Sequence, residues 1–176
     1  MRYKRYIGEK VYLTGLLPDD AGAITKWVND PEISEFLDSH RDVKSLDSVR
    51  EDVEGYIKTG AAFAIFDAET DALIGYCVLD GGHMNLLIGE KAYWRKGYDA
   101  EAVRFVLEFG FNLKNCTSIS ACAYAHDTRM LAFFEEAGFH KTAVMRERLL
   151  RGRQAYDLVF FDMLAREYFE RTKSNG

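Results

Sequence analysis

The sequence predicts an α/β protein of the α+β type, with a mixed, mostly antiparallel sheet and helices on both faces. Three observations predict this class: helical apolar spacing in the first third of the chain, two adjacent strand-like runs after Gly60, and alternating strand and helix patterns in the second half. Early antiparallel hairpins followed by alternating strands and helices produce a mixed sheet that is covered on its faces.

The first third of the chain predicts one strand and two helices. Residues 11–17 are apolar and end at Pro18, after which two aspartates open a helix. A turn is expected at residues 29–32, and a second helix over residues 45–58 ends at Gly60. Apolar residues at helical spacing support both helices, namely Ala21, Ile24, Trp27 and Val28 in the first, and Leu46, Val49, Val53, Tyr56 and Ile57 in the second.

The period changes after the second helix. Residues 61–66 and 73–79 are rich in branched and aromatic side chains, and the polar segment between them predicts a hairpin. Residues 84–88 predict a further short strand. The remaining elements are expected in this order: a helix over residues 100–112, a strand over 118–124, a helix over 128–137 that ends at Gly138, and strands over 142–150 and 155–164 around the turn at 151–153.

Length and composition predict one domain over residues 1–176. The chain is 48% hydrophobic and 29% charged, as is ordinary for a globular protein of this size. Cys77, Cys116 and Cys122 are odd in number and show no CxxC spacing, so we expect small core residues in a reducing compartment.

Charge and hydropathy exclude two classes of partner. The basic first residues are not followed by an apolar segment, and no apolar run is long enough to cross a bilayer, so we expect a cytoplasmic protein that does not bind membranes. A net charge of -5 argues against binding to nucleic acid. The same charge is compatible with an amine-bearing or cationic substrate.

One strand-to-helix turn combines a glycine with two cations. It contains Arg95, Lys96 and Gly97. Backbone N–H groups at a helix N-terminus carry partial positive charge and can bind a diphosphate. Gly97 permits close approach to the backbone, and the two cations add charge. Taken alone, this turn is explained equally well as a solvated basic turn capped by Asp99.

Several stretches taken together resemble the GNAT superfamily of acyltransferases. They read IGEKAYWRKGYDAEAVRFVLEFGF, HDTRMLAFFEEAGF and MRERLLRGRQAYDLVFFDML, and the opening GEKVYLTGLLPDDAGAITKWVNDPEI is also similar. The similar branch contains ribosomal-protein N-terminal acetyltransferases and spermidine N-acetyltransferases. The resemblance covers nearly the whole chain, and the glycine turn and the EEAGF helix end occur in the order and at the separation typical of the family.

The resemblance implies a GNAT fold that binds acetyl-CoA between two splayed central parallel strands, here residues 84–88 and 118–124. The amine of a small molecule or of a protein N-terminus would attack the thioester directly, and a backbone N–H near Ile88 would polarise its carbonyl. The pantetheine would pair with the first strand and the diphosphate with the turn. The expected cofactor-binding residues are Leu86, Leu87, Ile88, Arg95, Lys96, Gly97, Tyr98 and Ala100. No metal is expected. The oligomeric state is open, and a homodimer through the sheet edges or the last hairpin is one alternative.

This sequence departs from the family pattern at several places. Trp94 and Asp99 take the first and last places of the glycine turn. A carboxylate about 5 Å from a phosphate costs roughly 3 kcal/mol at an effective dielectric constant near 20. Asp127 replaces a common asparagine, and Phe134 replaces a tyrosine that protonates the leaving thiolate. Asp99, Asp127 and Phe134 favour an alternative, a catalytically degenerate domain that binds acyl-CoA or a partner without turnover.

Two residues are candidates for the general base. Glu90 follows the strand at residues 84–88 and is expected beside the thioester. His83 precedes that strand, near the place where some family members have a carboxylate, and an imidazole with a pKa near 6.5 suits a proton acceptor. Each is also explained as an ordinary surface residue. Tyr124 is a candidate for the missing proton donor, with a packed aromatic side chain as the alternative.

Overall fold

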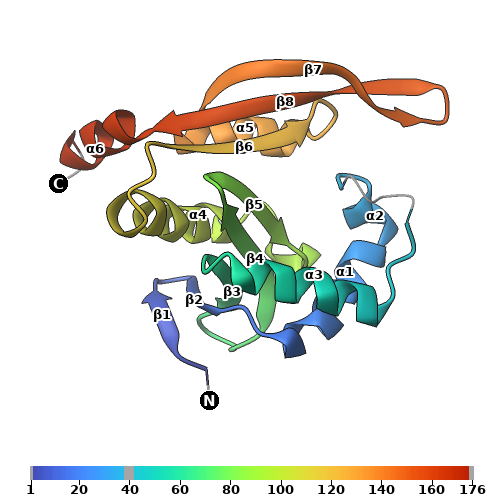
Figure 1. Cartoon of the computed structure of the whole chain (residues 1–176), viewed down its shortest axis with the longest axis horizontal. Helices are drawn as coiled ribbons and strands as arrows, with labels where there is room; N and C mark the ends of the chain where they lie inside the picture. Colours follow the sequence, from blue (N-terminus) through green and yellow to red (C-terminus); the bar gives the residue numbers. More distant parts are fainter. Residues whose placement is uncertain (1, 38–41, 175–176) are drawn as a thin grey trace. The chain divides into compact units, whose positions relative to one another are not determined.

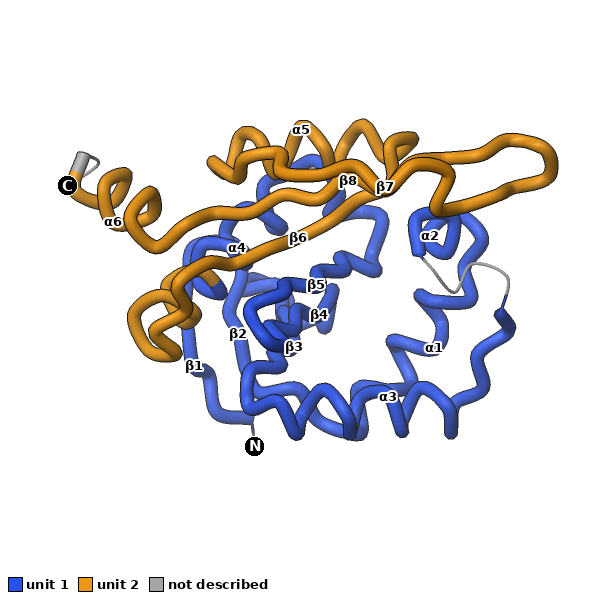
Figure 2. The backbone as a smooth tube through the Cα atoms, turned by 45° about the horizontal axis from the view of Figure 1, so that its top comes forward, with its two compact units in different colours: residues 1–106 blue, residues 107–176 orange. Residues whose placement is uncertain are grey.

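The computed structural model describes residues 2–37 and 42–174, and its helices and strands are labelled in Figure 1. The chain divides into two compact units, Met1–Val106 and Leu107–Gly176, called unit 1 and unit 2 (Figure 2). Each unit contains strands and helices of its own.

In the described residues of unit 1, five strands pair in chain order. Every neighbouring pair among them is antiparallel. The hairpin predicted after Gly60 is confirmed as the pair β3–β4. The strands are β1 (Lys4–Ile7), β2 (Val11–Gly15), β3 (Ala62–Asp67), β4 (Leu73–Asp80) and β5 (His83–Ile88).

The helices of unit 1 cover both faces of these strands. On one face, α1 and α3 pack their apolar sides against β2 and β3 in a cluster that contains Leu16, Val53 and Phe66. On the other face, Tyr6 contacts the rings of Phe63 and of Phe105 in α4. The helical segments are η1 (Pro18–Asp20), α1 (Ala21–Asn29), α2 (Pro31–Ser34), α3 (Leu46–Lys58), η2 (Lys91–Tyr93) and α4 (Tyr98–Glu108), the last of which ends in unit 2.

Unit 2 is built around a long hairpin. Strand β8 lies between β6 and β7 and is antiparallel to both. Phe134 in α5 is buried against the rings of Phe139 and Phe161. The elements are the π-helix Phe109–Leu113, β6 (Ser118–Tyr124), α5 (Thr128–Ala137), β7 (His140–Arg151), β8 (Gln154–Leu164) and α6 (Ala165–Ser174).

The structure corrects the sequence prediction at several boundaries. Helix α4 begins at Tyr98 rather than at residue 100, so Asp99 lies inside the first turn, where an acidic residue is favourable. Residues 29–32, expected as a turn, lead into the short helix α2, because the Asp30 side chain accepts the Glu32 N–H at 2.9 Å and caps it. Strand β1 and helix α6 were not predicted at all.

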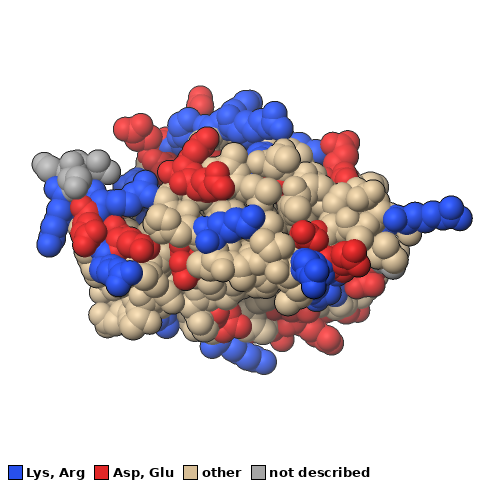
Figure 3. Space-filling view, turned by 90° about the horizontal axis from the view of Figure 1, so that it is seen from above, with Lys and Arg blue, Asp and Glu red and all other residues tan. Residues whose placement is uncertain are grey.

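Charge is distributed without a single dominant sign. Acidic and basic side chains are interspersed on the face drawn in Figure 3, in keeping with the mild net charge of -5.

None of the three cysteines forms a disulfide, and burial raises the pKa of the Cys77 thiol. Within the described ranges, no helix combines the length and the apolar character that a membrane span requires.

Candidate active site

The backbone N–H and C=O groups of successive residues in strand β5 point alternately toward β4 and away from it. The strand pairs with β4 along its whole length, and the Gly89 N–H that follows it donates to the Ile74 carbonyl at 2.8 Å. Antiparallel strands alternate between hydrogen-bonded and non-hydrogen-bonded pairs. Leu87 therefore directs its N–H and C=O toward β4, whereas Leu86 and Ile88 direct theirs away from it. Of the three residues expected to pair with pantetheine, Leu86 and Ile88 have the suitable orientation.

The side chain of Trp94 contacts the end of β5, six residues earlier in the chain. Its indole N–H donates to the Ile88 carbonyl at 2.7 Å, and its half-buried ring packs against the cluster formed by α1 and α3. This bond fixes the loop between β5 and α4 on the end of β5. Because a carbonyl oxygen has two lone pairs, the Ile88 oxygen can still accept a second N–H donor.

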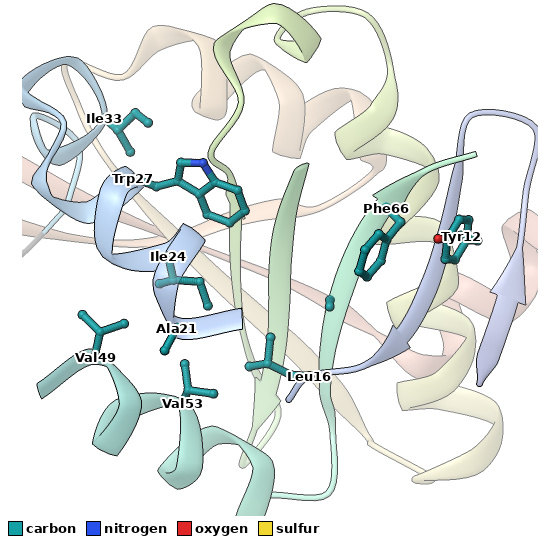
Figure 4. Close-up of a cluster of buried hydrophobic side chains, with 10 residues drawn as sticks. Tyr12, Leu16, Ala21, Ile24, Trp27, Ile33, Val49, Val53 and Phe66 are labelled. Atoms are coloured by element: carbon teal, nitrogen blue, oxygen red, sulfur yellow. The ribbon is translucent and has the colours of Figure 1, made fainter. Parts of the chain in front are cut away.

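Glu90 is fixed at the end of β5 by a side chain from α1. The Trp27 indole N–H donates to Glu90 Oε1 at 2.9 Å, and Figure 4 shows the Trp27 ring pointing from α1 toward the sheet. The ring lies against Gly89, where an added Cβ atom would be only 2.0 Å from Trp27 Cδ2. Glycine at position 89 is therefore what permits the indole to reach Glu90.

A group of ion pairs joins α2 and the residue before it to the same loop. Lys91 Nζ lies 2.9 Å from Asp30 Oδ2 and 3.3 Å from Glu32 Oε2. The hydrogen bond to Asp30 raises the pKa of Lys91, and the same bond lowers the pKa of Asp30. Lys91 and Glu32 are exposed and Asp30 is only half-buried, so these ion pairs contribute little to stability. Their effect is to add a second link between this part of unit 1 and the loop that carries Glu90.

The glycine turn has a backbone that suits an anion. Gly97 has a φ of 81° and Arg95 a φ of 59°, so both residues are left-handed. Turns with left-handed residues direct successive N–H groups into a concave anion-binding surface. Arg95 and Lys96 are exposed and Tyr98 is half-buried. The structure therefore keeps four of the predicted diphosphate-binding residues in one short turn at the start of α4.

The fifth predicted member of this turn is already hydrogen-bonded. The Ala100 N–H is 3.0 Å from Asp99 Oδ1, which accepts it, and Asp99 is only 8% exposed. The competition expected between the Asp99 carboxylate and a diphosphate therefore occurs at Ala100. The Glu101 N–H donates to the Gly97 carbonyl at 3.2 Å, so the amides that precede Ala100 carry the anion-binding potential of the turn.

The β1–β2 turn contacts the start of α4 through two side chains that the sequence analysis did not single out. The Glu101 carboxylate accepts the N–H groups of Glu9, Lys10 and Val11 at 3.0, 2.8 and 2.8 Å. In the opposite direction, Lys10 Nζ donates to the Lys96 carbonyl at 2.6 Å. The position of the glycine turn thus depends on residues far away in the sequence.

The two base candidates lie at opposite ends of β5. His83 begins the strand and Glu90 follows its end, and five residue steps from His83 to Ile88 span about 17 Å. His83 is half-buried, and burial lowers its pKa below 6.5, an effect that Asp80 partly opposes. The structure therefore does not bring the two candidates together, and a thioester at the predicted position beside Ile88 would lie nearer to Glu90.

The departures in unit 2 have structural explanations. The Asp127 side chain accepts the Met130 N–H at 3.0 Å and caps α5. Phe134 is 3% exposed and packs in the core of the unit. Tyr124 is also buried, in a cluster with Leu149 and Leu158. The packed alternative that we considered for Tyr124 agrees with this burial.

Comparisons with known proteins give a consistent result. A family model described as an acetyltransferase (GNAT) domain matches residues 10–140. The chain is 25% identical to an uncharacterized N-acetyltransferase, p20, of Bacillus licheniformis, over 91% of this chain and 96% of that protein. It is 32% identical to the probable N-acetyltransferase YjcK of Bacillus subtilis, over 49% of this chain and 52% of that protein.

Solved structures agree in fold. A spermidine N-acetyltransferase from Vibrio cholerae, in complex with CoA and spermine, superposes with a TM-score of 0.80 at 19% identity, over 92% of this chain and 99% of that chain. A GNAT-family acetyltransferase from Bacillus anthracis gives a TM-score of 0.78 at 18% identity, over 92% and 99% of the two chains. The predicted mixed α/β class is confirmed, while the splaying of β5 from β6 stays a prediction. This chain belongs to the GNAT family of acetyltransferases.

Proposed function

We propose that this protein moves an acetyl group from acetyl-CoA to a primary amine by direct attack, with a small molecule or a protein N-terminus as the acceptor. The observation that carries the proposal is the arrangement at the end of β5. There, the outward-facing backbone of Leu86 and Ile88 leads into the left-handed turn at Arg95 and Gly97, and then into α4. Membership of an acetyltransferase family supports the interpretation of this arrangement as an acetyl-CoA site.

This arrangement supplies the groups that bind acetyl-CoA and the base that accepts the proton of the amine. The pantetheine amides pair with Leu86 and Ile88, and the diphosphate binds the N–H groups between Arg95 and Tyr98. The amine nitrogen attacks the carbonyl carbon of the thioester, so that a C–N bond forms, the C–S bond breaks and CoA leaves as a thiolate. The thiolate takes up a proton from water, because Phe134 has none to donate. The proton lost by the amine passes to a base, for which Glu90 is our first choice. A backbone N–H near Ile88 stabilises the developing oxyanion.

A second candidate function is a domain that binds acyl-CoA or a partner without turnover. The observation that favours it is the buried Asp99 carboxylate at the start of α4, together with Phe134 in place of a proton donor. A cytoplasmic location, a single functional domain and a homodimer stay predictions under either function.

The first experiment separates these two functions. Acetyl-CoA at 100 times its dissociation constant is expected to stabilise the protein by about 2.7 kcal/mol, which raises Tm by roughly 5–10 °C for a chain of this size. A panel of primary amines is then assayed for release of free thiol. Release with at least one amine supports the enzyme. A rise in Tm with no release supports the binding domain, and neither effect contradicts both.

The second experiment tests the base. Glu90→Gln keeps an oxygen that accepts the Trp27 N–H but cannot take a proton, so kcat is expected to fall by about 100-fold or more with Tm nearly unchanged. His83→Ala is the comparison, because this residue lies at the far end of β5. If Glu90→Gln retains full rate while His83→Ala loses it, the base is His83. In that case, kcat/KM of the wild type should decline at a pH below 6.5, because burial lowers the pKa of this imidazole.

A further inference from the structure

Lys10 lies against the back of the glycine turn. It belongs to the β1–β2 turn, 86 residues before the carbonyl of Lys96 to which its Nζ donates at 2.6 Å. The same ammonium is 3.6 Å from the point where a Cβ on Gly97 would lie, and 5.7 Å from the centre of the Tyr98 ring. The Lys10 side chain therefore contacts the short segment that we assign to the diphosphate.

The hydrogen bond from Lys10 fixes the direction of the next N–H. No peptide bond in the described chain is cis. In a planar trans peptide, the carbonyl of one residue and the N–H of the next point in opposite directions. Since the Lys96 carbonyl points toward Lys10, the Gly97 N–H points away from Lys10, toward the opposite side of the turn.

Lys10 itself has a fixed backbone. Its N–H donates to Glu101 Oε2 at 2.8 Å, alongside the N–H of Val11 at 2.8 Å. Gly8 lies so close to this carboxylate that a Cβ there would be 2.4 Å from Glu101 Cδ. The backbone of Lys10 is thus bound to α4, while its side chain is bound to the turn that precedes α4. The two contacts together fix the turn relative to the helix.

We propose that Lys10 is a positioning residue for the diphosphate of acetyl-CoA. By binding the Lys96 carbonyl it directs the Gly97 N–H at the anion, and its ammonium adds positive charge behind the turn. The proposal rests on the proposed function, because it concerns the same cofactor site. It predicts a specific defect, namely weaker binding of ligands that carry the diphosphate and unchanged binding of ligands that lack it.

The test compares two acetyl donors. Lys10→Met removes the donor and the charge. With acetyl-CoA, KM is expected to rise by about 10- to 100-fold with kcat little changed, since a charge-assisted hydrogen bond contributes to binding on this scale. With S-acetylpantetheine, which has no diphosphate, KM and kcat are expected to match those of the wild type. The dissociation constants of CoA and pantetheine, measured by calorimetry, should show the same contrast without turnover.

Three controls make the outcome specific. Lys10→Arg keeps a charged donor and is expected to restore most of the affinity for CoA. Lys58→Met removes an exposed lysine at the end of α3 and should change neither donor's KM. The Tm of Lys10→Met should stay within about 2 °C of the wild type, because the bond to Glu101 uses the backbone of Lys10 rather than its side chain.

Each result is decisive. Equal losses with both donors, or no loss with either, would overturn the role of Lys10. The proposed function fails by a different result, in which the wild type neither binds CoA nor releases thiol, and the role of Lys10 then falls with it. If Lys10→Met does not fold, Lys10→Arg still tests the proposal. It keeps a charged donor and must therefore retain most of the wild-type affinity for CoA, so a large loss of that affinity would overturn the role of Lys10.

Discussion

Gly89→Ala is expected to lower the free energy of unfolding by about 3 kcal/mol, because overpacking of a buried site that cannot relax lies at the upper end of its usual cost. The new methyl carbon would lie 2.0 Å from Trp27 Cδ2 and 2.3 Å from Trp27 Cγ, far inside contact distance. The backbone at Gly89 cannot retreat freely, since its N–H donates to the Ile74 carbonyl. Trp27 is 4% exposed and is enclosed by the cluster of α1 and α3.

The same substitution is expected to reduce the rate of acetyl transfer beyond its effect on stability. A displaced Trp27 ring no longer donates its N–H to Glu90, so the carboxylate loses the bond that orients it at the end of β5. A catalytic group that is misplaced by about 1 Å can cost about 100-fold in rate. The measurements are urea denaturation followed by circular dichroism, and kcat under conditions where the variant is fully folded.

Gly55→Ala is the matched control for this prediction. Gly55 lies within α3, and a Cβ there has no neighbour within 4 Å. Alanine at an exposed helix position is expected to stabilise the protein by about 1 kcal/mol, because it reduces the conformational entropy of the unfolded chain. Should Gly89→Ala behave like Gly55→Ala, the close approach of Trp27 to the backbone is wrong, and the orientation of Glu90 needs another cause.

The elements that could be predicted from the sequence are those whose end signals are local. Helix α5 was predicted with its observed bounds, because Asp127 caps its first turn and Gly138 ends it in a left-handed conformation with a φ of 93°. Strand β6 was also predicted with its observed bounds, and it follows a simple branched and aromatic run. In both segments the local preference and the final structure agree.

The elements that were missed depend on partners elsewhere in the chain. Strand β1 reads KRYI, so half of its residues are cationic, and it becomes a strand through pairing with β2. Helix α6 reads AREYFERTKS and shows little apolar periodicity, but its Tyr168 and Phe169 contact the ring of Phe111. Neither segment carries a pattern strong enough to be recognised alone, because tertiary contacts override weak local preference.

The candidate site divides in the same way. The glycine turn and the base candidates could be predicted, because a strand, a turn and a helix follow one another in the sequence. The contacts that position them could not. Trp27 and Glu90 are 63 residues apart, Lys10 and Lys96 are 86 apart, and Lys10 and Glu101 are 91 apart. No local spacing signals a bond across such separations, so these positioning contacts emerge only from the folded chain.

Glu101→Gln is expected to lower the free energy of unfolding by about 2–3 kcal/mol at pH 7, the scale on which hydrogen bonds to a charged acceptor contribute. The carboxylate accepts three backbone N–H groups of the β1–β2 turn, one at Oε1 and two at Oε2. A glutamine offers only one acceptor oxygen. Its NH2 group would face a backbone N–H, and because both groups are donors, no hydrogen bond could form between them. Glu54→Gln, an exposed substitution in α3, is the control and should change stability by less than about 0.5 kcal/mol.

The pH dependence identifies the carboxylate charge as the cause. Burial alone would raise the pKa of Glu101, but the three N–H donors and the charge of Arg104 together outweigh burial, and the pKa is lowered from 4.5. A group with a lowered folded-state pKa stabilises the fold above its unfolded pKa, and this stabilisation is lost as the pH falls through the folded-state value. The difference in unfolding free energy between wild type and Glu101→Gln should therefore be constant from pH 7 to about pH 5 and shrink toward pH 3. Urea denaturation at a series of pH values measures this difference.

A difference of the same size at pH 7 and pH 3 would mean that the shape of the side chain, and not its charge, fixes the β1–β2 turn on α4. If wild type and Glu101→Gln do not differ in unfolding free energy at pH 7, the Glu101 carboxylate does not hold the backbone of Lys10 in place.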